Sequence, residues 1–199
     1  MFTLIRPKAA EINQRVAAAA KLLAAAPPLL SLYGGLRLAE RLPLGFAHDC
    51  RRSSIGVGGA AFAAAKAAFT HWVMFDLGWV RVANPEASIA PGQIVAIEAH
   101  TLGLCTLNLS RILTTIDSTT QFGFIYATTA LHVEEGEERF LLEFDPSSGD
   151  LWYEVEAVSR PKAVFARLGF PITRAFQHRF SRDSHRRMRA EALAVSVTS

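Results

Sequence analysis

Cysteine is scarce in this sequence. Cys50 and Cys105 are the only two cysteines among 199 residues, and they do not form a closely spaced pair. This argues against a disulfide framework and a zinc knuckle, and it is typical of a reducing compartment. Neither cysteine lies in a signature of a catalytic thiol, and no nucleophile elbow is present. We therefore expect a cytoplasmic protein.

Long apolar runs are also absent. No stretch of about eighteen uninterrupted apolar residues occurs, which argues against a helix that spans a membrane. The segment 17–30 follows a basic residue and is rich in alanine and leucine, as a secretory signal would be. Lys21 and Pro27–Pro28 interrupt this segment, and Glu11 precedes it, so we do not expect export.

An excess of one charge sign is lacking too, since the formal net charge is only +3. Arginines nevertheless crowd residues 174–189 around a single acid, Asp183. They are Arg174, Arg179, Arg182, Arg186, Arg187 and Arg189. A solvated helix face is our first interpretation, and contact with nucleic acid or an anionic membrane is the alternative. This face has no interleaved aromatic residues, which argues against single-stranded nucleic acid.

The composition indicates a globular domain with an extension, because 50% of the residues are hydrophobic and 20% are charged. Residues 1–50 contain one expected helix, over 9–26, followed by irregular chain, and we interpret them as an N-terminal helical arm or lid. The main domain is expected over residues 51–192. Residues 193–199 are expected to form a flexible tail.

A second helix is expected after Gly58–Gly59. Phe62, Ala65 and Phe69 recur at helical spacing and share one face, which should pack on a sheet. Leu77–Trp79 should end this helix, because glycine readily adopts the left-handed conformation found at helix ends.

From Gln93 onward the hydrophobic period changes to two, which is typical of strands. The expected strands cover residues 95–99, 104–117, 122–126, 140–144 and 152–158. Asp145–Asp150 carries the proline, serine and glycine of a turn, so the last two strands should form a hairpin. Short connections without helices predict an antiparallel sheet in which successive strands are neighbours.

The helical period returns after Pro161, with a stripe of apolar residues opposite the arginines. The stripe comprises Val164, Phe165, Leu168, Ile172, Phe176 and Phe180. Pro171 is expected to kink this helix because proline removes an internal hydrogen bond. We predict an α+β fold in which an antiparallel curved sheet wraps around a long C-terminal helix, with a cleft between them.

Glu138 is the most informative candidate residue. It has the parity of Phe140 and Leu142, so a carboxylate would lie among aromatic and apolar side chains and would need a partner such as Arg111 or Arg160. Our first interpretation is a salt bridge that fixes the strand register. The alternative is the polar end of a ligand pocket, which would comprise Glu138, His132 and Arg160 with walls from Phe124, Tyr126 and Trp152.

Two other site types fit the sequence poorly. The possible metal ligands His132, Glu134, Glu137 and Glu138 lack the one-turn spacing of helical metal motifs, and the adjacent Glu137 and Glu138 would point to opposite sides of a strand. The segment Gly56–Ala61 fits a dinucleotide-binding pattern, but no buried strand is expected before it and no βαβ unit after it. We therefore expect neither a metal nor a cofactor.

Six short motifs occur in order along the chain. They are Ile55–Gly58 before an alanine-rich helix, Trp72 with Leu77–Trp79, Leu107–Asn108 with Arg111, Gly123–Thr128, His132 with Gly136–Phe140, and Ser159–Pro161. In this order the chain resembles an uncharacterised protein family of bacteria and plants, a domain of unknown function. Its members are similar to the START and pollen-allergen (SRPBCC-like) helix-grip superfamily. That resemblance implies a hydrophobic ligand held between sheet and helix, and it supplies no reaction.

Three functional hypotheses follow. The first is binding of a hydrophobic or amphipathic small molecule between the sheet and the last helix. The second is a cyclase- or hydrolase-like enzyme that uses His132 or Glu138 as acid or base and Arg160 to hold an anionic intermediate. The third is a module whose basic helix contacts nucleic acid or an anionic membrane.

Overall fold

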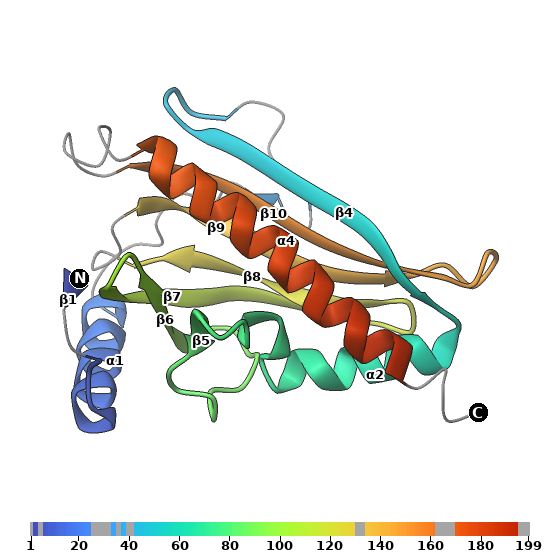
Figure 1. Ribbon diagram of the computed structural model, residues 1–199, viewed down its shortest axis with the longest axis horizontal. Coiled ribbons are helices and arrows are strands. Elements are labelled where there is room, and N and C mark those ends of the chain that lie inside the picture. The colour runs from blue at the N-terminus through green and yellow to red at the C-terminus, as the bar shows by residue number, and fades with distance from the viewer. Residues whose placement is uncertain are drawn as a thin grey trace.

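An antiparallel curved sheet with one long helix across its face dominates the computed structural model (Figure 1). The structure describes residues 2–3, 6–24, 33–34, 37–38, 42–129, 134–161 and 170–194. Seven strands follow one another in the order β4-β10-β9-β8-β7-β6-β5. Their bounds are β4 Ala47–Val57, β5 Val80–Val82, β6 Ile94–Thr101, β7 Leu104–Asp117, β8 Gln121–Thr128, β9 Glu134–Phe144 and β10 Asp150–Pro161.

Short strands and four helical segments complete the described chain. β1 (Phe2–Thr3) pairs with β7, and β2 (Tyr33–Gly34) pairs with β3 (Arg37–Leu38). The helical segments are α1 Ala9–Ala24, α2 Gly59–Thr70, the 3-10 turn η1 Val73–Phe75 and α4 Phe170–Ala194. The predicted fold class is confirmed: a curved antiparallel sheet, a long C-terminal helix and an N-terminal helix. Among the residues described, no helix has the length and apolar character needed to cross a membrane.

The two faces of the sheet are covered by different helices. α2 and α4 pack on what we call the inner face, where residues such as Val95, Phe124 and Tyr153 are buried. α1 packs on the outer face, where Ile12 contacts a cluster that includes Ile94. Because adjacent strand residues point to opposite faces, inner-face residues on a strand are two positions apart except at the β-bulges of β7 and of the β4–β10 pair. The candidate N-terminal arm therefore lies, through α1, on the face opposite α4.

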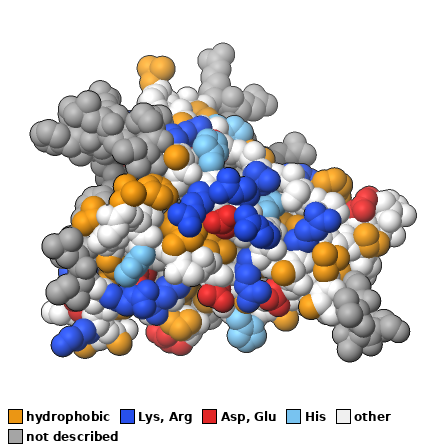
Figure 2. Space-filling view, viewed as in Figure 1, with side chains coloured by type: hydrophobic (Ala, Val, Ile, Leu, Met, Phe, Trp, Pro, Cys, Tyr) orange, Lys and Arg blue, Asp and Glu red, His pale blue; other side chains and the backbone are white. Residues whose placement is uncertain are grey.

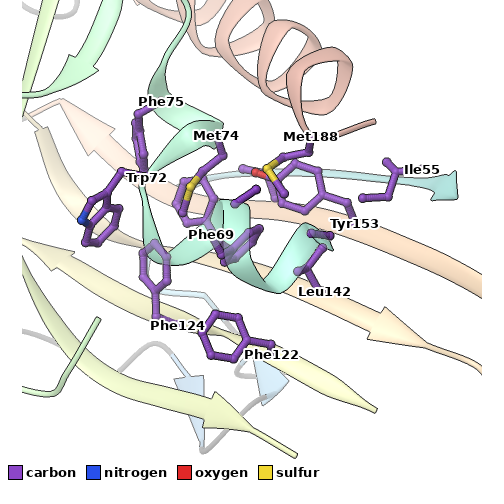
Figure 3. Packing of buried hydrophobic residues seen from close by; sticks show 14 of the residues in the cluster. Ile55, Phe69, Trp72, Met74, Phe75, Phe122, Phe124, Leu142, Tyr153 and Met188 are labelled. Carbon is purple, nitrogen blue, oxygen red and sulfur yellow. The ribbon is translucent and has the colours of Figure 1, made fainter. Parts of the chain in front are cut away.

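Aromatic side chains fill one half of the inner face, beneath α2 and the last turns of α4 (Figure 3). Phe69 of α2 is fully buried and meets Phe122, Phe124 and Tyr153 edge-on, with ring centroids 5.7–6.3 Å apart. Phe124 in turn stacks on Phe140 at 5.1 Å. This half of the fold is a close-packed core.

α2 ends earlier than predicted. It stops at Thr70, whereas the sequence suggested an end at Leu77–Trp79. Trp72 adopts the left-handed conformation, with φ 58°, and its indole N–H donates to the carbonyl oxygen of Ala87 at 2.9 Å. The buried Trp72 therefore belongs to a turn that follows α2, not to a continuation of the helix.

Pro171 and strand β4 also differ from expectation. Pro171 is the second residue of α4, a first-turn position where the missing N–H costs nothing, so it is not a kink in the helix as placed here. Residues 162–169, which carry part of the predicted stripe, lie outside the described residues. β4 covers 47–57, where irregular chain was expected, and it pairs with β10 along the sheet edge. Most of its residues are exposed or half-buried, so it lacks the alternation that marks a strand in sequence.

Candidate ligand cavity

A cavity of about 510 Å³ lies between the inner face of the sheet and the first half of α4. Its apolar walls include Phe75, Trp79, Phe176 and Phe180. The strands from β4 through β10 and β9 to β6 supply the floor. The cavity therefore occupies the half of the inner face that the aromatic core leaves open.

The inner face changes character along each central strand. At the core end, the inward-facing residues are Phe124 on β8, Phe140 on β9 and Val155 on β10. Further along the same strands, the residues that line the cavity are Tyr126 and Thr128 on β8, Glu138 and Gly136 on β9, and Ala157 and Ser159 on β10. Each step of two residues stays on the same face. Large apolar side chains thus give way to small and polar ones on three adjacent strands at once. The cavity is built by this gradient.

Tyr126 and Glu138 form the central polar pair of the floor. They are opposite one another in the β8–β9 register, and the Tyr126 hydroxyl donates a short hydrogen bond to Glu138 Oε2. Across Ala157, the next position in the same row is Asp49 of β4, which accepts hydrogen bonds from both terminal nitrogens of Arg174 on α4. A carboxylate among aromatic walls is costly unless hydrogen-bonded, and Tyr126 provides such a bond.

A second polar group of the lining lies on β7. The Asn108 side-chain oxygen is buried and has no hydrogen-bond partner within the described ranges, and the same is true of the Ser181 hydroxyl on α4. Gln177 of α4 donates to Ser159 at 3.4 Å, which links the helix to the floor. Buried acceptors such as the Asn108 oxygen are normally satisfied, so this group points to a ligand or water.

Trp79 contacts three residues of α4 above the cavity. Its indole N–H donates to Asp183 Oδ2 at 3.1 Å, its ring lies 6.0 Å from that of Phe176, and the Arg179 guanidinium sits 4.5 Å above it. On the opposite rim, the β6–β7 hairpin places Leu102 in the lining, with its side chain largely exposed. These groups border the opening.

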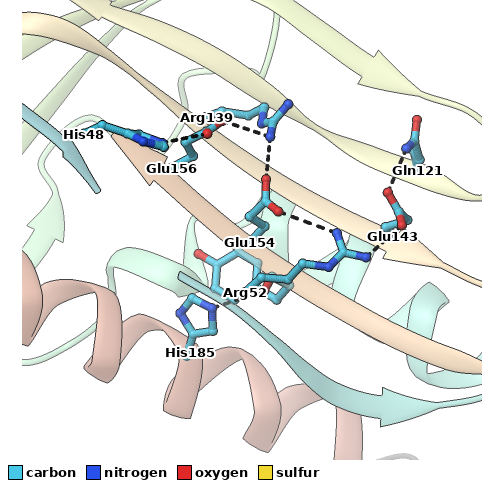
Figure 4. A network of polar contacts seen from close by, with 9 residues as sticks. His48, Arg52, Gln121, Arg139, Glu143, Glu154, Glu156 and His185 are labelled. Carbon is cyan, nitrogen blue, oxygen red and sulfur yellow. Dashed lines mark hydrogen bonds and ion pairs between the residues drawn. The ribbon is translucent and has the colours of Figure 1, made fainter. Parts of the chain in front are cut away.

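The outer face carries a ladder of ion pairs, shown in Figure 4. Arg139 reaches Glu154 at 2.5 Å and Glu156 at 2.9 Å, and both carboxylates are buried. The ladder continues through His48 at one end and Arg52 with Glu143 at the other. Three strands, β4, β9 and β10, contribute to it, so it links neighbouring strands on the side away from the cavity.

The predicted site residues that the structure describes separate into three groups, which lie in the cavity, in the core and on the outer face. Tyr126 and Glu138 line the cavity together. Phe124 lies one step deeper, in the fully buried core. His132 lies outside the described residues.

Trp152, Arg160 and Arg111 belong to the outer face. The Arg52 guanidinium lies 5.1 Å from the Trp152 ring centroid, and Arg160 pairs with Glu135 at 2.8 Å. Arg111 stands opposite Ile94, a residue of the α1-side cluster. Trp152 and Arg160 share the parity of Val158 on β10, and Val158 is buried on that face.

Several lining residues were not anticipated. They are Asn108, Ala157, Ser159, Phe176 and Gln177. The signal for Ala157 and Ser159 was present, because both follow Val155 at steps of two. This spacing places Ala157 and Ser159 on the inner face because Tyr153, and not Trp152, faces inward on β10.

The cysteines and a group of potential metal ligands have structural explanations. Cys50 is exposed, but partial desolvation of its thiol by the surrounding strands, with Glu154 and Glu156 nearby, raises its pKa to about 11, so little thiolate exists at neutral pH. The ligand atoms of Glu98, His100 and Cys105 lie within 4.8 Å of one another. Glu98 is already bound by Arg6 at 2.5 Å and Arg81 at 2.8 Å, and these two cations supply the charge that a metal would bring.

The arginines of α4 cover the outward side of the helix, where blue side chains gather in Figure 2. Arg179, Arg182 and Arg186 all lie within 3.2–3.6 Å of the Asp183 carboxylate. One acid thus organises three cations on an exposed face.

A curved antiparallel sheet, a long helix across its inner face and a cavity between them define the helix-grip fold. The structure is similar to that of Ara h 8.0201, with TM-score 0.51, 17% identity and coverage of 75% of this chain and 99% of that one. It is also similar to the di-domain ARO/CYC StfQ from the steffimycin biosynthetic pathway, with TM-score 0.52, 10% identity and coverage of 76% and 52%.

The chain belongs to the family described as a domain of unknown function (DUF1990), which matches residues 32–187. A UPF0548 protein of Dictyostelium discoideum is 35% identical over 151 residues, 70% of each chain. Another, from Deinococcus radiodurans, is 34% identical over 142 residues, which is 66% of this chain and 71% of that one.

Proposed function

We propose that this protein binds an apolar or amphipathic small molecule in the cavity between the sheet and α4. The observation that carries the proposal is the change along the inner face, from close-packed aromatic rings to small and polar residues around about 510 Å³ of space. Ligand sites of small molecules are typically mostly apolar, with a few polar groups and volumes of roughly 300–1,000 Å³.

The small residues support this function. Valine or leucine at positions such as Ala99 or Ala157 would fill space that is now open, and an unfilled cavity forfeits packing contacts. In a sheet selected for stability alone, large apolar side chains would be expected along the whole inner face. The gradient therefore fits a surface retained for a guest molecule.

A cavity-filling substitution tests the proposal. Ala157→Phe places an aromatic ring on the floor, and the matched control Ala63→Phe adds the same ring to an exposed position of α2. Gently purified protein should carry a bound species in native mass spectrometry, and Nile red should bind saturably. We expect Ala157→Phe to weaken Nile red binding by about tenfold or more, roughly 1.4 kcal/mol, because the ring occupies space that the dye would fill.

The control should bind the dye as the wild type does, and both variants should retain their circular dichroism. Absence of any bound species and of dye uptake in the wild type would refute the proposed function. Equal binding by wild type and Ala157→Phe would show that the dye sits elsewhere.

A further inference from the structure

One side of the cavity is bordered by what we call the seam, the line along which β4 and α4 face one another. Near its first end, both terminal nitrogens of Arg174 on α4 donate to Asp49 on β4. Near its other end, a Cβ added to Gly56 of β4 would lie 3.2 Å from the Cβ of Ala192 on α4. The strand and the helix therefore run in the same direction, and the positions between these contacts are neighbours.

Arg51 is an unpaired cation on this seam. It follows Asp49 by two residues, so it has the same inward parity, and it belongs to the cavity lining. Burial is the main cause of the lowered pKa of His185 on α4, and the positive charge of Arg51 adds to it, so the guanidinium lies on the α4 side of the strand. Within the described part of the chain Arg51 forms no ion pair, whereas Arg52 and Arg174 on the same two elements both do.

α4 supplies a second unpartnered group on the same side. The Ser181 hydroxyl belongs to the lining and is buried, and no described residue forms a hydrogen bond with it. Ser181 lies about two turns after Arg174 and four residues before His185, which shares its helix face. It therefore lies along the stretch of the seam that Arg51 occupies. Buried hydroxyls are normally satisfied, so this one is available to a guest.

The acids that face inward from the lining are held by other groups. Arg174 binds Asp49, and the Tyr126 hydroxyl donates to Glu138. Neither acid forms an ion pair with Arg51. The guanidinium of Arg51 is exposed at the edge of the cavity, and its charge is not neutralised by the described residues.

We propose that Arg51 and the Ser181 hydroxyl bind the carboxylate of an amphipathic ligand whose apolar tail occupies the cavity. This inference rests on the proposed function. Arginine forms charge-assisted and frequently bidentate hydrogen bonds with carboxylates, and these are roughly twice as strong as bonds between neutral groups. One unpaired arginine balances one negative charge, which favours a carboxylate over a phosphate group with nearly two. Because Arg51 is exposed, the carboxylate lies at the edge of the cavity and the tail extends inward.

Ligands with one tail and different head groups test this assignment. Decanoate, decanol and decylamine share an alkyl chain, and each is titrated against Nile red bound to the full-length protein at pH 8 and low salt. We expect decanoate to displace the dye at about one tenth of the concentration that decanol requires, or less, because the alcohol cannot pair with the guanidinium charge. Decylamine has the same charge sign as Arg51 and should require more ligand than decanoate.

Variants of Arg51 assign the preference to one residue. Arg51→Gln removes the charge and keeps a hydrogen-bond donor, so decanoate should lose about tenfold in affinity while decanol binds as before. Arg51→Lys keeps the charge without the planar fork and should retain part of the preference. Arg189→Gln makes the same change at an exposed position of α4 outside the lining and should behave as the wild type does.

Ser181→Ala separates binding from stability. We expect this variant to weaken decanoate by about threefold, as loss of one hydrogen bond would. Its melting temperature should stay at the wild-type value, because the described residues offer the hydroxyl no partner to lose. A lower melting temperature with unchanged decanoate affinity would make Ser181 a structural residue and remove it from the site.

The remaining outcomes distinguish the two proposals. If decanol or decylamine displaced Nile red from the wild type as well as decanoate does, or if none of the three displaced it, the carboxylate site would be wrong and small-molecule binding would stand. A preference for decanoate that persists in Arg51→Gln would overturn the role of Arg51. Failure of Nile red and all three ligands to bind would refute both proposals together.

Discussion

Leu102 is an apolar residue in a backbone conformation that favours glycine and asparagine. It has φ 53° and precedes Gly103 with φ 77°, so two left-handed residues make the turn between β6 and β7. Two-residue hairpin turns of this kind prefer Asn-Gly. Leu102 is 79% exposed, so packing contacts do not offset the cost of this backbone conformation. The residue lies at the rim of the cavity.

Replacement of Leu102 by asparagine should stabilise the protein. We expect Leu102→Asn to raise the free energy of unfolding by about 1 kcal/mol, because asparagine tolerates the left-handed conformation. Leu102→Ala removes the same exposed apolar surface but keeps the strain, so it should gain little. Urea unfolding of the three proteins gives the comparison. Equal stability of the asparagine and alanine variants would show that backbone strain is not the cause.

Residue parity predicted part of the site and left part of it open. It placed Glu138 among Phe140 and Leu142, and the structure finds its carboxylate beside Tyr126 on the inner face. It placed Trp152 in the pocket wall, whereas Tyr153 is the residue that faces inward, because β10 is buried on both faces, with Val155 inward and Val158 outward, and its sequence therefore gives no clear alternation. Which arginine meets which acid depends on strand register, and no local pattern encodes that register.

At the scale of elements, α4 is joined to β10 by one polar cluster. The Tyr153 hydroxyl lies 2.8 Å from the Ser184 hydroxyl, and His185 Nε2 lies 3.1 Å from the Tyr153 carbonyl oxygen. His185 Nδ1 is 2.7 Å from the carbonyl oxygen of Ser181. Burial, assisted by the positive charge of Arg51, lowers the pKa of His185 below its ordinary value.

This shift predicts a stability that depends on pH. A histidine whose pKa is lower in the folded state takes up its proton more readily when unfolded, so stability is full above the unfolded pKa of about 6.5 and falls below it. The melting temperature should drop between pH 7.5 and pH 5.5, and His185→Gln should remove much of that drop. His178→Gln, on the exposed side of the same helix, should keep the wild-type response. Parallel profiles for all three proteins would contradict the assignment.

Elements with a strong period were predictable and elements without one were not. β7 was predicted over 104–117 and covers Leu104–Asp117, because its fourteen residues are rich in apolar and β-branched side chains. β4 was missed because its hydrogen bonds to β10 need no apolar side chains. β5, with three residues, is too short to show a period.

At the scale of the whole molecule, the inner face is divided between a core that stabilises the fold and a cavity that we propose binds a ligand. α2 and the end of α4 cover the first half, and the first half of α4 covers the second (Figure 1). The sequence predicted a sheet wrapped around a helix with a cleft. It could not predict where the core ends and the cavity begins, because that boundary depends on which residues of the six floor strands lie side by side.

This division predicts that Phe69 contributes mainly to stability and Phe176 mainly to ligand affinity. Phe69 is fully buried against three aromatic rings of the core, so Phe69→Ala should cost about 3–5 kcal/mol of unfolding free energy. Phe176 lines the cavity and packs against Trp79 on one side, so Phe176→Ala creates less new empty space and should cost clearly less. Urea unfolding measures both values.

Nile red affinity should show the opposite order. Phe176→Ala removes part of the cavity wall and should lower the affinity for Nile red. Phe69→Leu is a smaller change that should leave the core folded. This variant should bind the dye nearly as the wild type does, because Phe69 is not part of the lining. Stability and affinity then vary independently across one sheet face. If Phe69→Leu and Phe176→Ala lowered both quantities in the same proportion, core and cavity would form a single cooperative unit and the division would not hold.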